Sequence, residues 1–317
     1  MRFERIEHID AYNCINACIS TLAHHYGKEY FMIAGGNWGL VLDSESKGKR
    51  LGERIDIIND FDGTCRTKKF HGFSWNMENV DEKDRNDVTG EFKGYKFPML
   101  VRVDLFELER IGFYQKFHIP HNLIVYSYNA DDKCYSCLDP FFEYEEFTLN
   151  KDTLLQAMST CGTLELFPEP KEIELQDYME AIKEDMDMVG KDNLNYINIL
   201  RLAEELEENF DIGLEFEGFQ NQLHAVPIMD KIRKVAQARD AYCCMLDGIY
   251  RLYQIEAVKN AATQLKQSVN MWLMLKAKLL KMYLTKPSET DKKAMIQMLK
   301  QIAELEKGVV ALLQNIL

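Results

Sequence analysis

The sequence changes character near residue 150, and this change limits the fold more than any other feature. Between residues 98 and 149, β-branched and aromatic residues form short runs separated by turn residues, namely KFPMLVRVD (96–104), HNLIVYSYN (121–129) and CYSCLDP (134–140). These runs, with the polar turn NADDK between the last two, predict three sequential strands of one antiparallel sheet. After residue 150 the apolar residues recur at helical spacing instead. The sequence therefore predicts an α+β first half and an all-helical second half.

The helical half divides into several segments. Helical spacing predicts helices over 174–188 and 191–209, and residues 228–284 contain no proline and are long enough for two or three helices. Pro287 ends that stretch, and Ser288 begins a capping-box-like start for a last helix that reaches the C-terminus. We therefore expect two domains, residues 1–165 with a helix and an antiparallel sheet, and residues 166–317 with helices alone.

Near the N-terminus, residues 14–26 place apolar side chains on one helical face. Asn13 lies where an N-cap side chain is favoured, and Gly27 is suited to end the helix. Residues 34–39, AGGNWG, form a glycine-rich turn but lack the Lys-Ser/Thr of a P-loop, which argues against a phosphate cradle. We expect this turn to be a loop near a binding cleft.

The charge of the chain limits its partners. The net charge of −13 argues against a nucleic-acid partner. Residues 151–217 carry 5 basic and 18 acidic side chains, whereas residues 218–317 carry 15 basic and 8 acidic side chains, a net of +7. The basic region is either a solvated surface that pairs with the acidic segment or a docking face for an acidic partner.

No apolar run reaches the ~20 residues of a membrane helix, and the N-terminus has no signal-peptide core, so we expect a cytoplasmic protein without a membrane partner.

Eight cysteines are present, and a reducing compartment favours free thiols. Cys134 and Cys137 have the spacing of a zinc pair, but no second close pair accompanies them. Cys14 and Cys18, followed by His24 and His25, form a looser alternative. We expect neither a bound metal nor a resident cofactor.

Cys14 is the candidate nucleophile, because the N-terminus of a helix favours negative charge and lowers the pKa of a thiol. His121 opens the strand 121–129, and Asp139 ends the next predicted strand. A histidine and a carboxylate on adjacent strands can face each other with Cβ atoms roughly 5 Å apart. The carboxylate then orients the imidazole, which takes the proton of the thiol. The residues thus predict a nucleophile, a base and an orienting acid in the order Cys14, His121, Asp139.

The segments around these residues resemble papain-like cysteine proteases. HIDAYNCINACISTLAHHYG and HNLIVYSYNADDKCYSCLDP are similar to the cysteine and histidine segments of bacteriocin-processing peptidases. The His-x-x-x-x-x-Cys start, the following glycine-rich turn and the helical C-terminal region more closely resemble the family of the butirosin-biosynthesis acyltransferase. The amide-forming protease homologue of closthioamide biosynthesis looks like a member of the same group. The resemblance covers about residues 5–150 by motif and the remainder by architecture alone.

By position, the resemblance implies that Cys14 is the nucleophile, His121 the base and Asp139 the orienting acid. Where the peptidases have an oxyanion glutamine this chain has His8, which departs from the family pattern, so His8 and Asn13 beside the backbone N–H of Cys14 are our oxyanion candidates. His118 is predicted to be a loop residue or part of the cleft wall. Its substitution is expected to leave measurable activity, whereas His121→Ala is expected to abolish turnover.

The resemblance implies acyl transfer rather than proteolysis. In this interpretation Cys14 takes an acyl chain from the phosphopantetheine arm of an acyl or peptidyl carrier protein, and a small amine, such as a diamine, collects it in specialised-metabolite (antibiotic) biosynthesis. The carrier would dock on the basic helices of residues 218–317. Two alternatives stay open, a cysteine peptidase or amidase that hydrolyses its acyl-enzyme, and a non-catalytic adaptor whose helical domain binds a partner.

Overall fold

The computed structural model describes residues 3–6, 9–36, 38–43, 45–46, 49–57, 63–81, 96–109, 112–142, 144–168, 173–219, 222–285 and 288–316. The chain divides into two compact units. Unit 1 contains Met1–Ile33 and Asp62–Glu172, and unit 2 contains Ala34–Phe61 and Ile173–Leu317. Because the two units are separately packed, each is described by itself.

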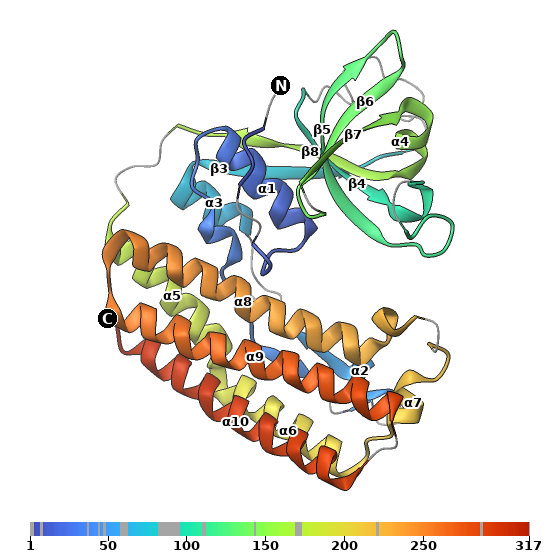
Figure 1. Cartoon of the computed structure of the whole chain (residues 1–317). Helices are drawn as coiled ribbons and strands as arrows, with labels where there is room; N and C mark the ends of the chain where they lie inside the picture. The colour runs from blue at the N-terminus through green and yellow to red at the C-terminus, as the bar shows by residue number, and fades with distance from the viewer. Residues whose placement is uncertain are drawn as a thin grey trace. The chain divides into compact units, whose positions relative to one another are not determined.

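Unit 1 is built on a six-stranded antiparallel sheet with the strand order β3-β8-β4-β5-β6-β7 (Figure 1). Its strands are β3 (Phe73–Asn79), β4 (Met99–Asp104), β5 (Pro120–Asn129), β6 (Cys134–Asp139), β7 (Glu145–Asn150) and β8 (Met158–Leu166). The helices of this part of the chain are α1 (Cys14–His25), η1 (Phe31–Ala34), α3 (Gly63–His71), η3 (Leu105–Glu107) and α4 (Lys151–Ala157). The three strands predicted from sequence are β4, β5 and β6, and they are neighbours in the sheet as predicted.

The central strands of this sheet are covered on both faces. Along β5 every residue from His121 to Val125 is buried, which fits a strand that reads as a continuous apolar run. One face packs into a cluster that includes Val101, Val103 and Leu123. Helix α1 packs against β5. This packing holds the start of α1 beside the start of β5, where the candidate residues lie.

Helix α1 forms and ends as the sequence predicts. The Oδ1 atom of Asn13 accepts a hydrogen bond from the backbone N–H of Asn16 at 2.9 Å, as an N-cap does. The helix ends at Tyr26, and Gly27 adopts φ +69°, a left-handed conformation that glycine enters without a Cβ clash. The predicted N-cap and helix stop are therefore confirmed.

Unit 2 is mostly helical. Its elements are β1 (Leu40–Leu42), α2 (Leu51–Arg54), β2 (Ile55–Ile57), α5 (Leu175–Val189), η4 (Lys191–Asn193), α6 (Leu194–Glu208), α7 (Ile212–Phe216), η5 (Leu223–Ala225), α8 (Pro227–Tyr253), α9 (Glu256–Leu284) and α10 (Glu289–Gln314). The predicted helical stretch 228–284 is two helices, because Gln254 takes a left-handed conformation at φ 54°. The Oγ atom of Ser288 caps α10 by accepting from the N–H of Asp291 at 3.1 Å, while Pro287 lies outside the described residues.

The domain boundaries differ from the prediction of 1–165 and 166–317. The later boundary lies at 172/173, and residues 34–61, predicted within the first domain, belong to unit 2. The side chain of Asn195 accepts from the N–H of Leu40 at 2.7 Å, and that of Asn198 donates to the carbonyl of Leu40 at 2.9 Å. Trp38 is fully buried beside Tyr242. The glycine-rich turn predicted near a binding cleft therefore leads into the core of the helical unit.

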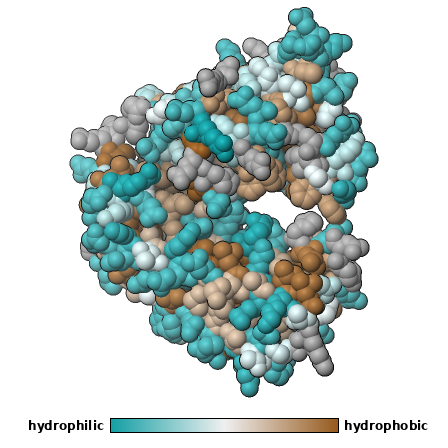
Figure 2. Space-filling model, in the orientation of Figure 1, coloured by the Kyte–Doolittle hydropathy of each residue, from teal (hydrophilic) through white to brown (hydrophobic). Residues whose placement is uncertain are grey.

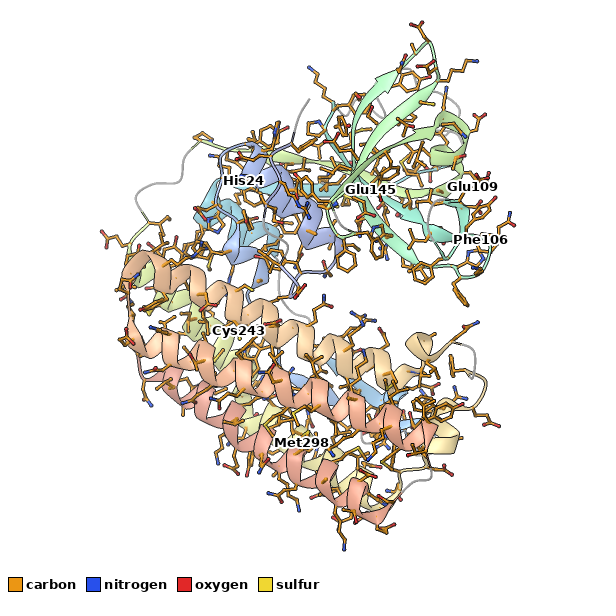
Figure 3. All side chains as sticks on the ribbon, viewed as in Figure 1. His24, Phe106, Glu109, Glu145, Cys243 and Met298 are labelled. Atoms are coloured by element: carbon orange, nitrogen blue, oxygen red, sulfur yellow. The ribbon has the colours of Figure 1, made fainter. Side chains whose placement is uncertain are left out.

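A fully buried ion pair lies in the core of unit 2. The guanidinium of Arg239 donates to both carboxylate oxygens of Glu306, at 2.5 and 2.8 Å, and neither side chain is exposed. Three more side chains donate to the same carboxylate: Asn195, Ser268 and Trp272. Figure 3 labels Cys243 on α8 and Met298 on α10, whose buried side chains belong to the same helical unit.

The structure is therefore α+β, with antiparallel sheets and a helical C-terminal region. On the face shown in Figure 2, hydrophilic residues surround patches of hydrophobic ones. Among the residues described, no helix combines the length and apolar character needed to cross a membrane.

Candidate active site

Cys14 is the first residue of α1, directly after the N-cap Asn13. Its side chain is partly exposed, while Ala17 and Cys18, one turn further along, are buried. The unpaired N–H groups at a helix start carry partial positive charge and favour a thiolate over a thiol. The local sequence thus places the sulfur in an electropositive and accessible position.

His121 and Asp139 lie on the neighbouring strands β5 and β6. The Nε2 atom of His121 is 2.9 Å from the Oδ2 atom of Asp139, and each side chain is only 4% exposed. The register pairs Ile124 with Leu138, so Asp139 is level with Leu123 and diagonal to His121. The two side chains therefore meet as predicted, although across a diagonal and not directly across the ladder.

The turn after β6 fixes the carboxylate of Asp139. Its Oδ1 atom accepts hydrogen bonds from the backbone N–H groups of Phe141 and Phe142, both at 3.1 Å. The rings of these two residues pack against the imidazole of His121, with centroid distances of 5.9 and 5.0 Å. One carboxylate oxygen is thus held by the turn while the other orients the imidazole of His121.

The sulfur of Cys14 interacts with both His121 and Asn122. Burial raises the pKa of Cys14, but hydrogen bonds from His121 and Asn122 and the charge of His121 outweigh it and lower the pKa below that of an ordinary cysteine. The Nδ2 atom of Asn122 donates to the sulfur at 3.2 Å. Cys14 therefore differs from an ordinary thiol in having donors directed at it.

His121 is shifted in the matching direction. Burial lowers its pKa, but hydrogen bonds to Asp139 and Cys14, with the charges of both, raise the pKa of His121 to about 9. A thiol with a lowered pKa beside an imidazole with a raised pKa favours transfer of the proton from sulfur to nitrogen. Both shifts favour the thiolate–imidazolium form of the pair, which is the reactive form of a cysteine nucleophile.

Asn122 was not predicted as a site residue. Successive side chains of a strand point to opposite faces of the sheet. If His121 points at the thiol, this alternation predicts that Asn122 points away from it. Both reach the sulfur because Cys14 lies beside the first residues of β5. The polar Asn122, at 8% exposure in an otherwise apolar run, is the signal in the sequence that could have identified it.

The predicted oxyanion residues have different outcomes. His8 lies outside the described residues, so its role stays a prediction. The side-chain oxygen of Asn13 is used as the cap of α1, and the residue is exposed. The cap places the backbone N–H of Cys14 at the open start of the helix, where it remains a candidate oxyanion donor.

His118 lies apart from this cluster. It is 72% exposed in the loop before β5, its Nδ1 atom is 2.6 Å from Oδ2 of Asp104, and its ring stacks on Phe106 (labelled in Figure 3) at 4.2 Å. The prediction that His118 is a loop residue is confirmed.

Several other described cysteines lie in environments that differ from that of Cys14. Cys18 is completely buried one turn below it, and burial raises its pKa. In unit 2, burial likewise raises the pKa of Cys244 to about 12. Cys134 and Cys137 direct their thiols at nearby backbone carbonyls, those of Asp132 and Tyr135. Within the described ranges, no three His, Cys, Asp or Glu side chains are grouped closely enough to hold a metal ion.

Comparison with known families adds no further assignment. No protein-family model matches the chain, and the curated proteins contain no significant match. The functional argument therefore depends on the residues and their geometry.

Proposed function

We propose that this protein is a papain-like, cysteine-dependent acyltransferase that forms amide bonds. The observation that carries the proposal is the partly exposed Cys14 sulfur at a helix N-terminus, interacting with an imidazole, that of His121, which Asp139 orients at 2.9 Å. Nucleophile, base and orienting acid are the three parts that covalent acyl chemistry requires. Asn122 adds a donor at the sulfur and stabilises the thiolate.

In the first half-reaction the thiolate of Cys14 attacks the carbonyl carbon of a carrier-bound thioester. The carbon–sulfur bond to the phosphopantetheine arm breaks, and the departing thiolate takes the proton from the His121 imidazolium. The products are an acyl group on Cys14 and the free thiol of the carrier. We expect the backbone N–H of Cys14, at the open start of α1, to stabilise the oxyanion of the tetrahedral intermediate.

In the second half-reaction a neutral amine attacks the acyl-enzyme. The neutral imidazole of His121 accepts a proton from the amine nitrogen, and the Cys14 thiolate leaves. The amide is released, and the thiolate–imidazolium pair is restored. Hydrolysis follows the same steps with water in place of the amine, so the difference between a transferase and a peptidase or amidase lies in which nucleophile reaches the acyl-enzyme.

The carrier protein has a candidate docking face in unit 2. Residues 218–317 have a net charge of +7. Exposed lysines lie along α8 and α9, including Lys234, Lys266 and Lys281, each of which also pairs with an aspartate. A basic helical surface complements an acidic carrier and steers its approach. A cytoplasmic location, where thiols stay reduced and carriers are present, belongs to the same proposal.

Incubation with an acyl carrier protein bearing a thioester, with and without a diamine, tests this function by intact-mass spectrometry. We expect the mass of the acyl group on the wild-type chain, no added mass on Cys14→Ala, and an amide product when the amine is present. Cys18→Ala is the matched control, since it removes the neighbouring thiol on the same helix. Free acid as the product in every reaction would refute transfer and favour the peptidase or amidase. The absence of any acyl-enzyme, together with slow alkylation of Cys14, would favour the adaptor.

A further inference from the structure

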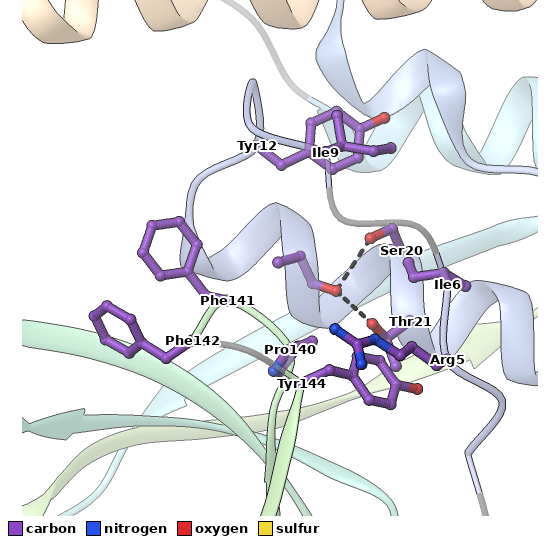
Figure 4. Close-up of a pocket in the computed structure, with 11 residues that line it drawn as sticks. Arg5, Ile6, Ile9, Tyr12, Ser20, Thr21, Pro140, Phe141, Phe142 and Tyr144 are labelled. Atoms are coloured by element: carbon purple, nitrogen blue, oxygen red, sulfur yellow. Dashed lines mark hydrogen bonds between the residues drawn. The ribbon is translucent and has the colours of Figure 1, made fainter.

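A pocket of about 320 Å³ lies in unit 1 beside the candidate active site (Figure 4). Three segments line it: the chain that leads to Cys14, one side of helix α1, and the turn that follows Asp139. The lining residues that matter here are Ile9, Tyr12, Ala17, Phe141, Phe142 and Tyr144. Neither half-reaction of the proposed acyl transfer uses this pocket.

The pocket adjoins the reacting groups. Phe141 and Phe142, which line it, also pack against the imidazole of His121. Ala17 and Thr21 lie three and seven residues after Cys14 on α1, which places them on the same side of the helix as the cysteine. A group attached to the Cys14 sulfur therefore has this pocket as an adjacent space.

The buried hydroxyls that α1 contributes to the lining are turned to their own helix. Ser20 and Thr21 both donate to the carbonyl of Ala17, at 3.0 and 2.8 Å (dashed in Figure 4). Those donors are satisfied within α1, so the helix presents mainly hydrocarbon to an occupant. Tyr12, Phe141, Phe142 and Tyr144 add aromatic rings to the lining, and the Tyr144 hydroxyl donates to the carbonyl of Glu4 at 2.6 Å.

The charge of the lining favours an apolar acyl group over a cationic amine as the occupant of the pocket. Arg5 is the charged residue among the described lining, with its guanidinium 5.9 Å from the ring centroid of Tyr144. A cationic amine would be repelled by this guanidinium, which already lies over the ring of Tyr144. An apolar acyl group is not repelled, and its burial is favourable.

We propose that this pocket holds the acyl group carried by Cys14, and that the preferred acyl groups are aryl or medium-length alkyl chains. A cavity of about 150 Å³ accommodates one benzene ring, so a pocket of twice that volume accepts roughly a dozen carbon atoms. This inference rests on the proposed function only in that Cys14 becomes acylated. It adds that the donor is selected by its apolar chain and that the amine enters from elsewhere.

A series of pantetheine thioesters tests the proposal. Acetyl, butyryl, hexanoyl, octanoyl and benzoyl donors are compared by the kcat/KM for acylation of Cys14. We expect kcat/KM to rise about fourfold per added methylene until the pocket is full. Ala17→Leu, which places three more carbons in the pocket, is expected to reduce the octanoyl-to-acetyl ratio at least tenfold. Asn16→Leu places a leucine at a neighbouring position of α1 outside the pocket lining, with no change in the number of side-chain heavy atoms, and is expected to leave the ratio unchanged.

Ile9→Ala is the second variant, because it enlarges the pocket and is expected to move the optimum to longer chains. Equal kcat/KM across the series, or an Ala17→Leu effect confined to the KM of the amine, would overturn the proposal. If no thioester acylates Cys14, the proposed function fails and alkylation decides the pocket separately. N-octyl iodoacetamide should then label Cys14 faster than iodoacetamide, with that preference lost in Ala17→Leu; no preference would refute the pocket.

Discussion

Each unit buries an ionic cluster, and the two clusters differ in whether one member stays accessible. In unit 2 the carboxylate of Glu306 accepts from Arg239, Asn195, Ser268 and Trp272, and the ion pair has no exposed surface. In unit 1 His121 and Asp139 are equally well buried, but Cys14 remains partly exposed. Both clusters perturb pKa values. The Arg239–Glu306 cluster has no atom that a substrate can reach. The cluster in unit 1 lowers the pKa of Cys14, whose sulfur is accessible.

The Glu306 pKa illustrates the structural case. Burial raises it, but the charge and hydrogen bonds of Arg239 outweigh burial and lower it below the ordinary value. The carboxylate thus stays ionised because its partners are complete, and the rings of Trp38 and Trp272 lie over the guanidinium at 5.6 and 5.3 Å. This comparison indicates that pKa perturbation alone does not identify an active site; perturbation together with access does.

The largest effect is expected from His121→Ala. Without the imidazole, the Cys14 thiol loses both its proton acceptor and a hydrogen bond to the thiolate, so acylation from a carrier thioester should fall roughly 10³- to 10⁴-fold. Stopped-flow or quenched intact-mass measurements give the rate. Circular dichroism and the unfolding midpoint serve as the control for folding. If the acylation rate decreased by less than tenfold, the His121–Asp139 cluster would have a structural role, like the Arg239–Glu306 cluster, and not a catalytic one.

Arg239→Met tests the other cluster. It leaves a buried carboxylate without its cation, which typically costs about 3–5 kcal/mol of folding free energy. Urea unfolding followed by tryptophan fluorescence is a suitable measurement, because Trp272 contacts Glu306. The double variant Arg239→Met/Glu306→Leu should recover much of the loss. The alkylation rate of Cys14 in native conditions should stay within about twofold, and a large fall would contradict a purely structural role.

Asn122→Ala is expected to have an intermediate effect. Removing a hydrogen bond to a charged group costs about 1.5–3 kcal/mol, which raises the pKa of Cys14 by roughly one to two units. The lowered pKa of the wild-type thiol means that its alkylation reaches a plateau below the pH at which ordinary cysteine ionises. In the variant the rise should move to higher pH, and the rate at pH 7 should fall about tenfold.

Ser127→Ala is the matched control on the same strand, far from the sulfur, and its pH profile should overlay that of the wild type. An unshifted profile for Asn122→Ala would show that its contact with the sulfur at 3.2 Å does not stabilise the thiolate.

The smallest effect is expected from His118→Ala. This side chain is mostly exposed and bonds to Asp104 outside the cluster, so acylation should keep most of the wild-type rate. Steady-state rates with the same carrier substrate provide the comparison with His121→Ala. A loss comparable to that of His121→Ala would mean that HIPH contributes its first histidine, and not its second, to the chemistry.

The sequence alone predicted the features that depend on local patterns. Asn13 as N-cap, Gly27 as helix stop and three consecutive strands follow from side-chain preferences within a few residues. The pairing of His121 with Asp139 could also be predicted from the sequence, because the two residues lie at the ends of neighbouring strands that one short turn connects.

Tertiary structure alone decided the remainder. Residues 34–61 join unit 2 because Asn195 and Asn198, about 155 positions away, bind the backbone of Leu40. Asn122 reaches the sulfur because α1 packs at the start of β5, against the alternation that its strand predicts. Such contacts join residues that are distant in sequence, so no short-range pattern encodes them. Cys14 could be chosen from sequence as the reactive thiol, but its hydrogen-bond partners and adjoining pocket exist only once the segments have packed together.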